Sequence, residues 1–215
     1  MLRRVFIENK KLITIIAVFI IGLGIGAATV SFVFSDDVTV DVKLDGENST
    51  VNMLALPFNG HTVNMKKEME NFAFRQMFDV DSNVTTLKEG LTEIANKHGF
   101  KDVNVNIYSQ FGKDTMPMLI TVDGVSMVPT LQDGERVIIE KSQNPKVGDI
   151  IVARDSEKGL LIKRLGDKKG DQIFLASDNN DTIVSVVNGV PLTMVAVEKW
   201  TDASNVVGIA RIFNV

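Results

Sequence analysis

The longest uncharged stretch of the chain lies near its amino end and limits its fold more than any other feature. No charged residue occurs from Leu12 to Phe34, and most positions there carry Ile, Val, Leu, Phe, Ala or Gly. As a helix this stretch would measure roughly 35 Å, which exceeds a hydrocarbon core of about 30 Å. The sequence therefore predicts a transmembrane anchor over residues 12–34.

The charges that flank this stretch predict its orientation. Residues 1–11 carry four basic residues against one acidic residue, and three aspartates follow the stretch within a few positions. The positive-inside bias predicts a cytoplasmic tail over residues 1–11 and an extracytoplasmic remainder, hence a single-pass protein of the cell membrane. A cleaved secretory signal is the alternative, but its apolar region would be shorter, about 7 to 15 residues.

Composition excludes several classes of function. The 215-residue chain has a net charge of -4 and no cysteine. An acidic balance argues against nucleic acid as a partner, and the lack of cysteine removes thiol nucleophiles and cysteine-rich zinc sites. No metal or nucleotide motif occurs, so no cofactor is expected.

Residues 35–115 are predicted to form a small α/β region of unknown role. Residues 38–44 and 103–107 alternate apolar and polar side chains, as half-buried strands do. Between them, residues 64–78 have helical spacing, and Thr86 with Glu89 resembles a capping box that opens a second helix ending near Gly99. His98 is interpreted as a residue that caps this helix rather than as a metal ligand.

Residues 116–215 are predicted to form a mostly β domain. Short apolar runs alternate with turn signals, and Asn188-Gly189 is the clearest of these because a two-residue hairpin needs positive φ at both positions. The predicted strands span residues 118–122, 136–140, 149–153, 160–165, 172–176, 183–187, 192–197 and 206–213.

A lysine in this β domain has the surroundings of a general base. The chain has only two histidines, both in the α/β region, and neither lies in a catalytic motif. A lysine can replace histidine if burial lowers the pKa of its amine from about 10.4 toward roughly 7 to 8. Lys163 alternates with Leu161 and Leu165 on one predicted strand face, so it is the candidate base. The alternative is an edge-strand lysine that discourages aggregation.

Ser126 is the candidate nucleophile. It follows a predicted strand, with Gly124 before it to allow close approach of a substrate and Pro129 after it to shape the turn. Taken alone, the pattern is more typical of a turn serine that hydrogen-bonds its own backbone.

Four segments around these residues resemble those of type I signal peptidases. They are Ser126-Met127-Val128-Pro129-Thr130-Leu131, Val147 to Val152, Ile162 to Leu165, and Ser177-Asp178-Asn179, where Ser177 replaces the usual glycine. Lys163 follows Ser126 by 37 residues, a compact spacing similar to that of the LexA-type self-cleaving repressors. The resemblance implies a coiled β catalytic domain preceded by the anchor and the small α/β region.

The same resemblance implies a mechanism. Ser126 would attack the scissile carbonyl, Lys163 would accept its proton and later activate water, and the Ser126 backbone N–H would stabilise the oxyanion. Gly124, Met127, Pro129, Asp178 and Asn179 would shape the site without reacting. Some family members have a serine at the position of Gly124, so the second oxyanion donor is unassigned here.

Three functions follow as hypotheses. The first is a membrane-anchored serine endopeptidase that removes signal peptides from exported precursor proteins, with the lipid bilayer as its other partner. The second is a peptidase that cleaves itself or one dedicated substrate. The third is an inactive, membrane-tethered binding module on a peptidase fold.

Overall fold

The computed structural model describes residues 36–55, 60–142, 144–179, 183–187, 190–194 and 197–215. Residues 35–215 cluster into one compact unit. Among the described helices, none is long and apolar enough to cross a membrane. The anchor predicted over residues 12–34 and the tail before it lie outside the described residues.

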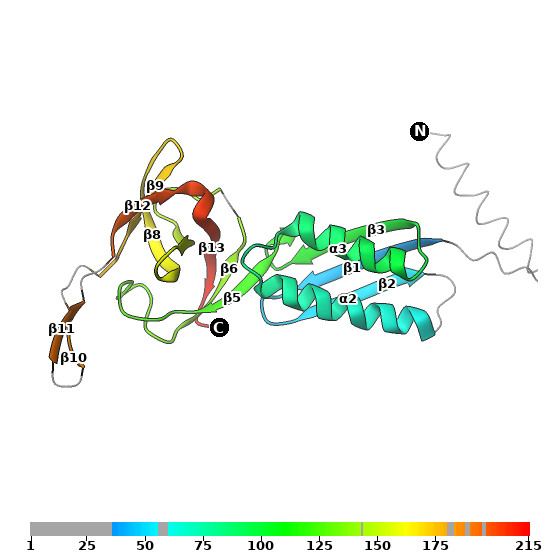
Figure 1. The fold of residues 1–215 in the computed structure, drawn as a ribbon, viewed down its shortest axis with the longest axis horizontal. Coiled ribbons are helices and arrows are strands. Elements are labelled where there is room, and N and C mark those ends of the chain that lie inside the picture. The colour runs from blue at the N-terminus through cyan, green and yellow to red at the C-terminus, as the bar shows by residue number, and fades with distance from the viewer. Residues whose placement is uncertain (1–35, 56–59, 143, 180–182, 188–189, 195–196) are drawn as a thin grey trace, which may run out of the picture. The chain divides into compact units, whose positions relative to one another are not determined.

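The first sheet has four strands in the order β2-β1-β3-β4 (Figure 1). β1 pairs with β2 in antiparallel and with β3 in parallel orientation. The strand β2 was not predicted, because its consecutive Met53, Leu54 and Ala55 obscure the alternation that marks a strand. The strands are β1 (Asp37–Leu44), β2 (Ser49–Ala55), β3 (Asp102–Ser109) and β4 (Gly112–Lys113).

Two helices, α2 (Gly60–Phe78) and α3 (Val84–Lys97), connect β2 to β3 and pack on the sheet. Alternate residues of β1, from Val38 to Leu44, are at most 2% exposed, and they meet fully buried methionines and leucines of the helices. The period-two strand and the helical spacing therefore direct their apolar faces into one shared core.

The predicted cap of α3 was wrong by three residues. Asn83 is the N-cap, and its side chain accepts hydrogen bonds from the backbone N–H groups of Thr85 and Thr86. Thr86 completes the box by accepting from the Asn83 N–H, so it is the third residue of the helix rather than its cap. At the other end His98 is the C-cap, and its Nε2 lies 3.0 Å from Glu68 Oε2.

The second sheet has seven strands in the order β12-β9-β8-β7-β13-β6-β5. β13 pairs with both β6 and β7, with register shifts in each pairing. A Cβ at Gly208 in β13 would lie 2.5 Å from the carbonyl oxygen of Glu140, so glycine permits this close approach. Such irregularities let the sheet curl, as Figure 1 shows, and they confirm the prediction of a mostly β, coiled architecture.

The strand boundaries in this part follow the predicted ones to within one or two residues, except in three strands. β8 is longer than predicted, β12 was not predicted, and β11 begins at Val190 instead of Leu192. β10 and β11 form a separate hairpin in which Val187 pairs with Val190; the predicted turn residues Asn188 and Gly189 lie outside the described residues. The strands are β5 (Pro117–Thr121), β6 (Arg136–Glu140), β7 (Ile150–Asp155), β8 (Gly159–Lys169), β9 (Gln172–Ala176), β10 (Ile183–Val187), β11 (Val190–Met194), β12 (Lys199–Asp202) and β13 (Val206–Phe213).

Candidate active site

Ser126 lies in the turn that connects β5 to β6. Gly124 adopts a φ of 92° and donates its N–H to Asp133 Oδ1 at 2.8 Å. Met127 follows Ser126 and is 1% exposed, so its side chain anchors the turn in the apolar core below the sheet. The peptide bond before Pro129 is cis. These contacts leave the Ser126 side chain half-buried at the surface of a pocket.

Lys163 lies on β8, which is paired on one side with β7 and on the other with β9. The interpretation of Lys163 as an edge-strand lysine is therefore wrong. Its side chain is only 3% exposed, and the apolar row predicted from Leu161 to Leu165 is formed. Burial is the main cause that lowers the pKa of the Lys163 amine, and the positive charge of Lys158 lowers this pKa further.

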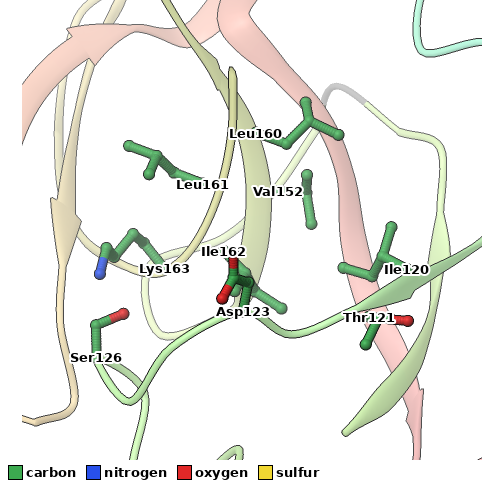
Figure 2. A pocket seen from close by; sticks show the side chains of 9 residues that line it. All are labelled: Ile120, Thr121, Asp123, Ser126, Val152, Leu160, Leu161, Ile162 and Lys163. Carbon is green, nitrogen blue, oxygen red and sulfur yellow. The ribbon is translucent and has the colours of Figure 1, made fainter. Parts of the chain in front are cut away.

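One pocket contains both candidate catalytic side chains. Ser126 and Lys163 are among its nine lining residues. Figure 2 shows the Ser126 hydroxyl and the Lys163 amine at the same end of the pocket. Branched aliphatic side chains form most of the remaining wall: Ile120, Val152, Leu160, Leu161 and Ile162. A substrate carbonyl in this pocket would lie beside a hydroxyl nucleophile and an amine whose pKa is lowered.

A second serine contacts the Lys163 amine. Lys163 Nζ donates a hydrogen bond of 2.9 Å to Ser177 Oγ, and the Ser177 hydroxyl donates to the carbonyl oxygen of Val197 at 3.4 Å. Ser177 is 7% exposed and lies just after β9. The sequence pattern marked Ser177 only as a replacement for a glycine. Its contact with Lys163 depends on β9 being the neighbour of β8, which no local pattern reveals.

The segment after β9 connects the base to the nucleophile turn. Arg164 forms a bidentate ion pair with Asp178, with bonds of 2.7 and 2.6 Å, and this ion pair is the main cause that holds the pKa of the Asp178 carboxyl below its usual value. Asn179 donates its backbone N–H to the carbonyl oxygen of Ser126 at 3.0 Å, and its side-chain amide donates to that of Val125 at 3.0 Å. These bonds place Asp178 and Asn179 where they can hold the turn in position.

Comparison with known proteins agrees with this geometry. A model of the peptidase S24-like family matches residues 86–196, more than half of the chain. The chain belongs to the peptidase S24-like family. This membership confirms the resemblance inferred from the ordered segments and supports a serine peptidase.

One relative of this peptidase S24-like chain is signal peptidase I of Bacillus amyloliquefaciens. The two are 40% identical over 62 residues, which cover 26% of this chain and 32% of the relative. The chain thus matches about a third of the length of this relative. The likeness supports the resemblance to type I signal peptidases that the ordered segments indicate.

Proposed function

We propose that this protein is a serine endopeptidase in which Ser126 is the nucleophile and Lys163 is the general base. The observation that carries the proposal is the position of Lys163. Its amine is buried on an interior strand, opens to the same pocket as Ser126, and forms no ion pair with any described carboxylate. Burial lowers the pKa of the Lys163 amine more than the nearby carboxylates of Glu198 and Asp178 raise it. The neutral amine, which is the form that accepts a proton, is therefore favoured.

In the proposed reaction, Lys163 accepts the Ser126 hydroxyl proton while Ser126 Oγ attacks the scissile carbonyl. Collapse of the tetrahedral intermediate breaks the peptide bond, and the protonated Lys163 supplies the proton that the leaving amine needs. Lys163 then takes a proton from water, which attacks the acyl-enzyme. Collapse of the second tetrahedral intermediate breaks the ester bond, and the protonated Lys163 returns the proton to Ser126 Oγ. The Ser126 N–H is the proposed oxyanion donor.

The experiment compares the purified full-length protein with Ser126→Ala, Lys163→Ala and Lys146→Ala on a precursor that carries small residues before the cleavage site. Lys146 is exposed and does not line the pocket, so Lys146→Ala is the control for loss of a lysine charge. We expect cleavage by the wild type and Lys146→Ala, and loss of at least roughly a hundredfold in the other two variants. Equal cleavage by all four proteins would refute the proposal.

We further propose that the substrates are exported precursor proteins and that residues 12–34 anchor the enzyme in the membrane. The uncharged run of the sequence and the similarity to signal peptidase I support this proposal. Alkaline extraction of membranes that contain the full chain, followed by protease treatment from each side, tests the anchor and its orientation. Recovery of the full chain in the soluble fraction would exclude an integral anchor.

Self-cleavage is the second candidate, favoured by the compact spacing from Ser126 to Lys163. Incubation of the full chain alone distinguishes the two functions. A fragment that accumulates in the wild type at a rate independent of protein concentration, and is absent in Ser126→Ala, supports self-cleavage. A chain that stays intact while it cleaves added precursor supports the first candidate.

A further inference from the structure

The proposed catalytic pocket contains a carboxylate that the mechanism does not use. Asp123 lies in the turn after β5, three residues before Ser126, and its exposed side chain is one of the nine that line the pocket. In the view of Figure 2 the Asp123 carboxylate is drawn between Lys163 and Thr121. Among the described residues no hydrogen bond or ion pair holds this carboxylate.

Neighbouring carboxylates have structural roles that Asp123 lacks. Asp133, in the same β5–β6 connection, accepts the Gly124 N–H, and Asp178 is paired with Arg164. Asp123 is therefore not needed to hold the turn through its side chain. A carboxylate that is free of protein partners and open to a substrate pocket is available to a substrate.

When Lys163 is in its neutral base form, the Asp123 carboxylate determines the charge of the pocket. Lys163 is neutral in its base form, and Asp123 is then the only ionised side chain among the lining residues. The charged groups that act on Lys163 from nearby, Lys158, Glu198 and Asp178, do not line the pocket. The remaining wall is apolar except for the Thr121 and Ser126 hydroxyls, so the pocket presents a single negative charge on an aliphatic surface.

A basic side chain matches this arrangement. Lysine has a four-carbon stem that can lie along apolar surface while its ammonium reaches a polar group. Here the stem would lie against aliphatic side chains such as Ile120 and Ile162, and the ammonium would meet the Asp123 carboxylate. An acidic side chain in the same place would be repelled, and a neutral polar one would lack the charge attraction.

We propose that Asp123 is a specificity residue that selects substrates with a lysine or arginine in the segment lying beside it in the pocket. The inference rests on the proposed endopeptidase function and names a feature of its substrates. An ion pair that stays partly in contact with water contributes little, so the expected preference for lysine over glutamine is roughly two- to fivefold in kcat/KM.

The test uses the full-length protein and a parent peptide that has a neutral sequence with small residues before the cleaved bond. A set of variants carries lysine, glutamine or glutamate at each of the five positions on either side of that bond. The kcat/KM of each is measured with the wild type, Asp123→Asn, Asp123→Lys and Asp171→Asn. Asp171 is exposed and outside the pocket lining, so Asp171→Asn controls for loss of one negative charge.

At one or more positions we expect the wild type and Asp171→Asn to cleave the lysine peptide with a higher kcat/KM than the glutamine peptide. At the same position Asp123→Asn should cleave these two peptides equally well. Asp123→Lys should there favour the glutamate peptide. Added salt should reduce the wild-type preference, a measurement that needs no variant. Cleavage of the parent peptide without a lysine preference at any position, or a preference that persists in Asp123→Asn, overturns the inference alone. No cleavage of any peptide overturns the proposed function and this inference with it.

Discussion

The two sheets of the compact unit bury different kinds of polar side chains. In the α/β region the buried polar residues are the neutral Thr62 and Ser82, whereas the seven-stranded sheet buries the charged Asp155 and Lys163 together with Ser177. Burial of a charge costs free energy unless it is paired, so a region that retains buried charges retains them for a reason. The seven-stranded sheet, which contains the buried charges, is therefore the better candidate for the catalytic site.

Within that sheet the two buried charges also differ. Asp155 forms an ion pair with Lys199 and accepts two backbone N–H groups at 3.0 Å, and the contact with Lys199 is the main cause that lowers the pKa of the Asp155 carboxyl. The Lys163 amine donates a hydrogen bond to the neutral Ser177 hydroxyl and forms no ion pair with a carboxylate of the described residues. The neighbours of Asp155 thus stabilise its charged form, whereas burial favours the neutral form of the Lys163 amine.

The largest expected effect is the loss of activity when the Lys163 amine is removed. Lys163→Met keeps the length of the side chain and removes the amine, so kcat/KM should fall by roughly 10² to 10⁴, the usual contribution of a general base. The melting temperature should stay the same or rise, because a desolvated amine is replaced by an apolar group. Activity assays and thermal unfolding measure both. A clear loss of stability would show that Lys163 supports the fold instead.

The next effect concerns the α/β core. Leu91→Ala removes a fully buried side chain from the cluster between the helices and their sheet, and we expect a loss of about 2 to 5 kcal/mol in unfolding free energy. The kcat/KM of the folded protein should be unchanged, because Leu91 does not line the catalytic pocket. Urea unfolding and assays at low temperature separate the two quantities. A matched loss of activity in fully folded protein would show coupling between this core and the site.

A third effect depends on pH and concerns a half-buried lysine. Lys141 donates from its amine to the carbonyl oxygens of Gln76, Asp79 and Ser82, and burial lowers the pKa of this amine to about 8. Below about pH 8 the folded protein must keep a desolvated ammonium, whereas the unfolded chain holds it in water. Between about pH 8 and 10.5 the unfolded state therefore binds more protons, and stability should rise by at most about 3 kcal/mol.

Lys141→Met isolates this effect. The difference in unfolding free energy between the wild type and Lys141→Met, measured from pH 7 to 10.5, should follow the titration of one group. The variant removes the amine and leaves the other lysines to titrate as before. Parallel pH profiles for the two proteins would contradict the lowered pKa.

The smallest effect tests the contact that positions the base. Ser177→Ala removes the hydroxyl that accepts from Lys163 Nζ, and we expect kcat/KM to fall by roughly two- to tenfold. Since this acceptor favours the protonated amine, its loss should also move the acidic limb of the pH profile to lower pH. Ser177→Thr keeps the hydroxyl and should restore both values. An unshifted profile, or no rescue by threonine, would mean that Ser177 acts only in packing.

Local sequence patterns predicted the strands and helices whose formation depends mainly on residues close in sequence. The alternation in β1 and β8, the apolar spacing of α2 and α3 and the order of the motif segments all depend on residues close in sequence. The cap at Asn83 and the strand β2 were misplaced or missed because their local signals are ambiguous: Thr86 suits both a cap and a third helical position, and three apolar residues in a row conceal the period of β2.

Local sequence patterns were sufficient to place Ser126 in a turn after a strand and Lys163 in an apolar row. Three other features depend on the packing of distant segments. β8 lies between two other strands, Lys163 contacts Ser177, and Asp123 lines the same pocket as Ser126. The physical reason is that burial and pairing depend on which strands become neighbours. That choice is made by contacts between residues far apart in the chain, whereas periodicity records only the direction of each side chain along its own strand.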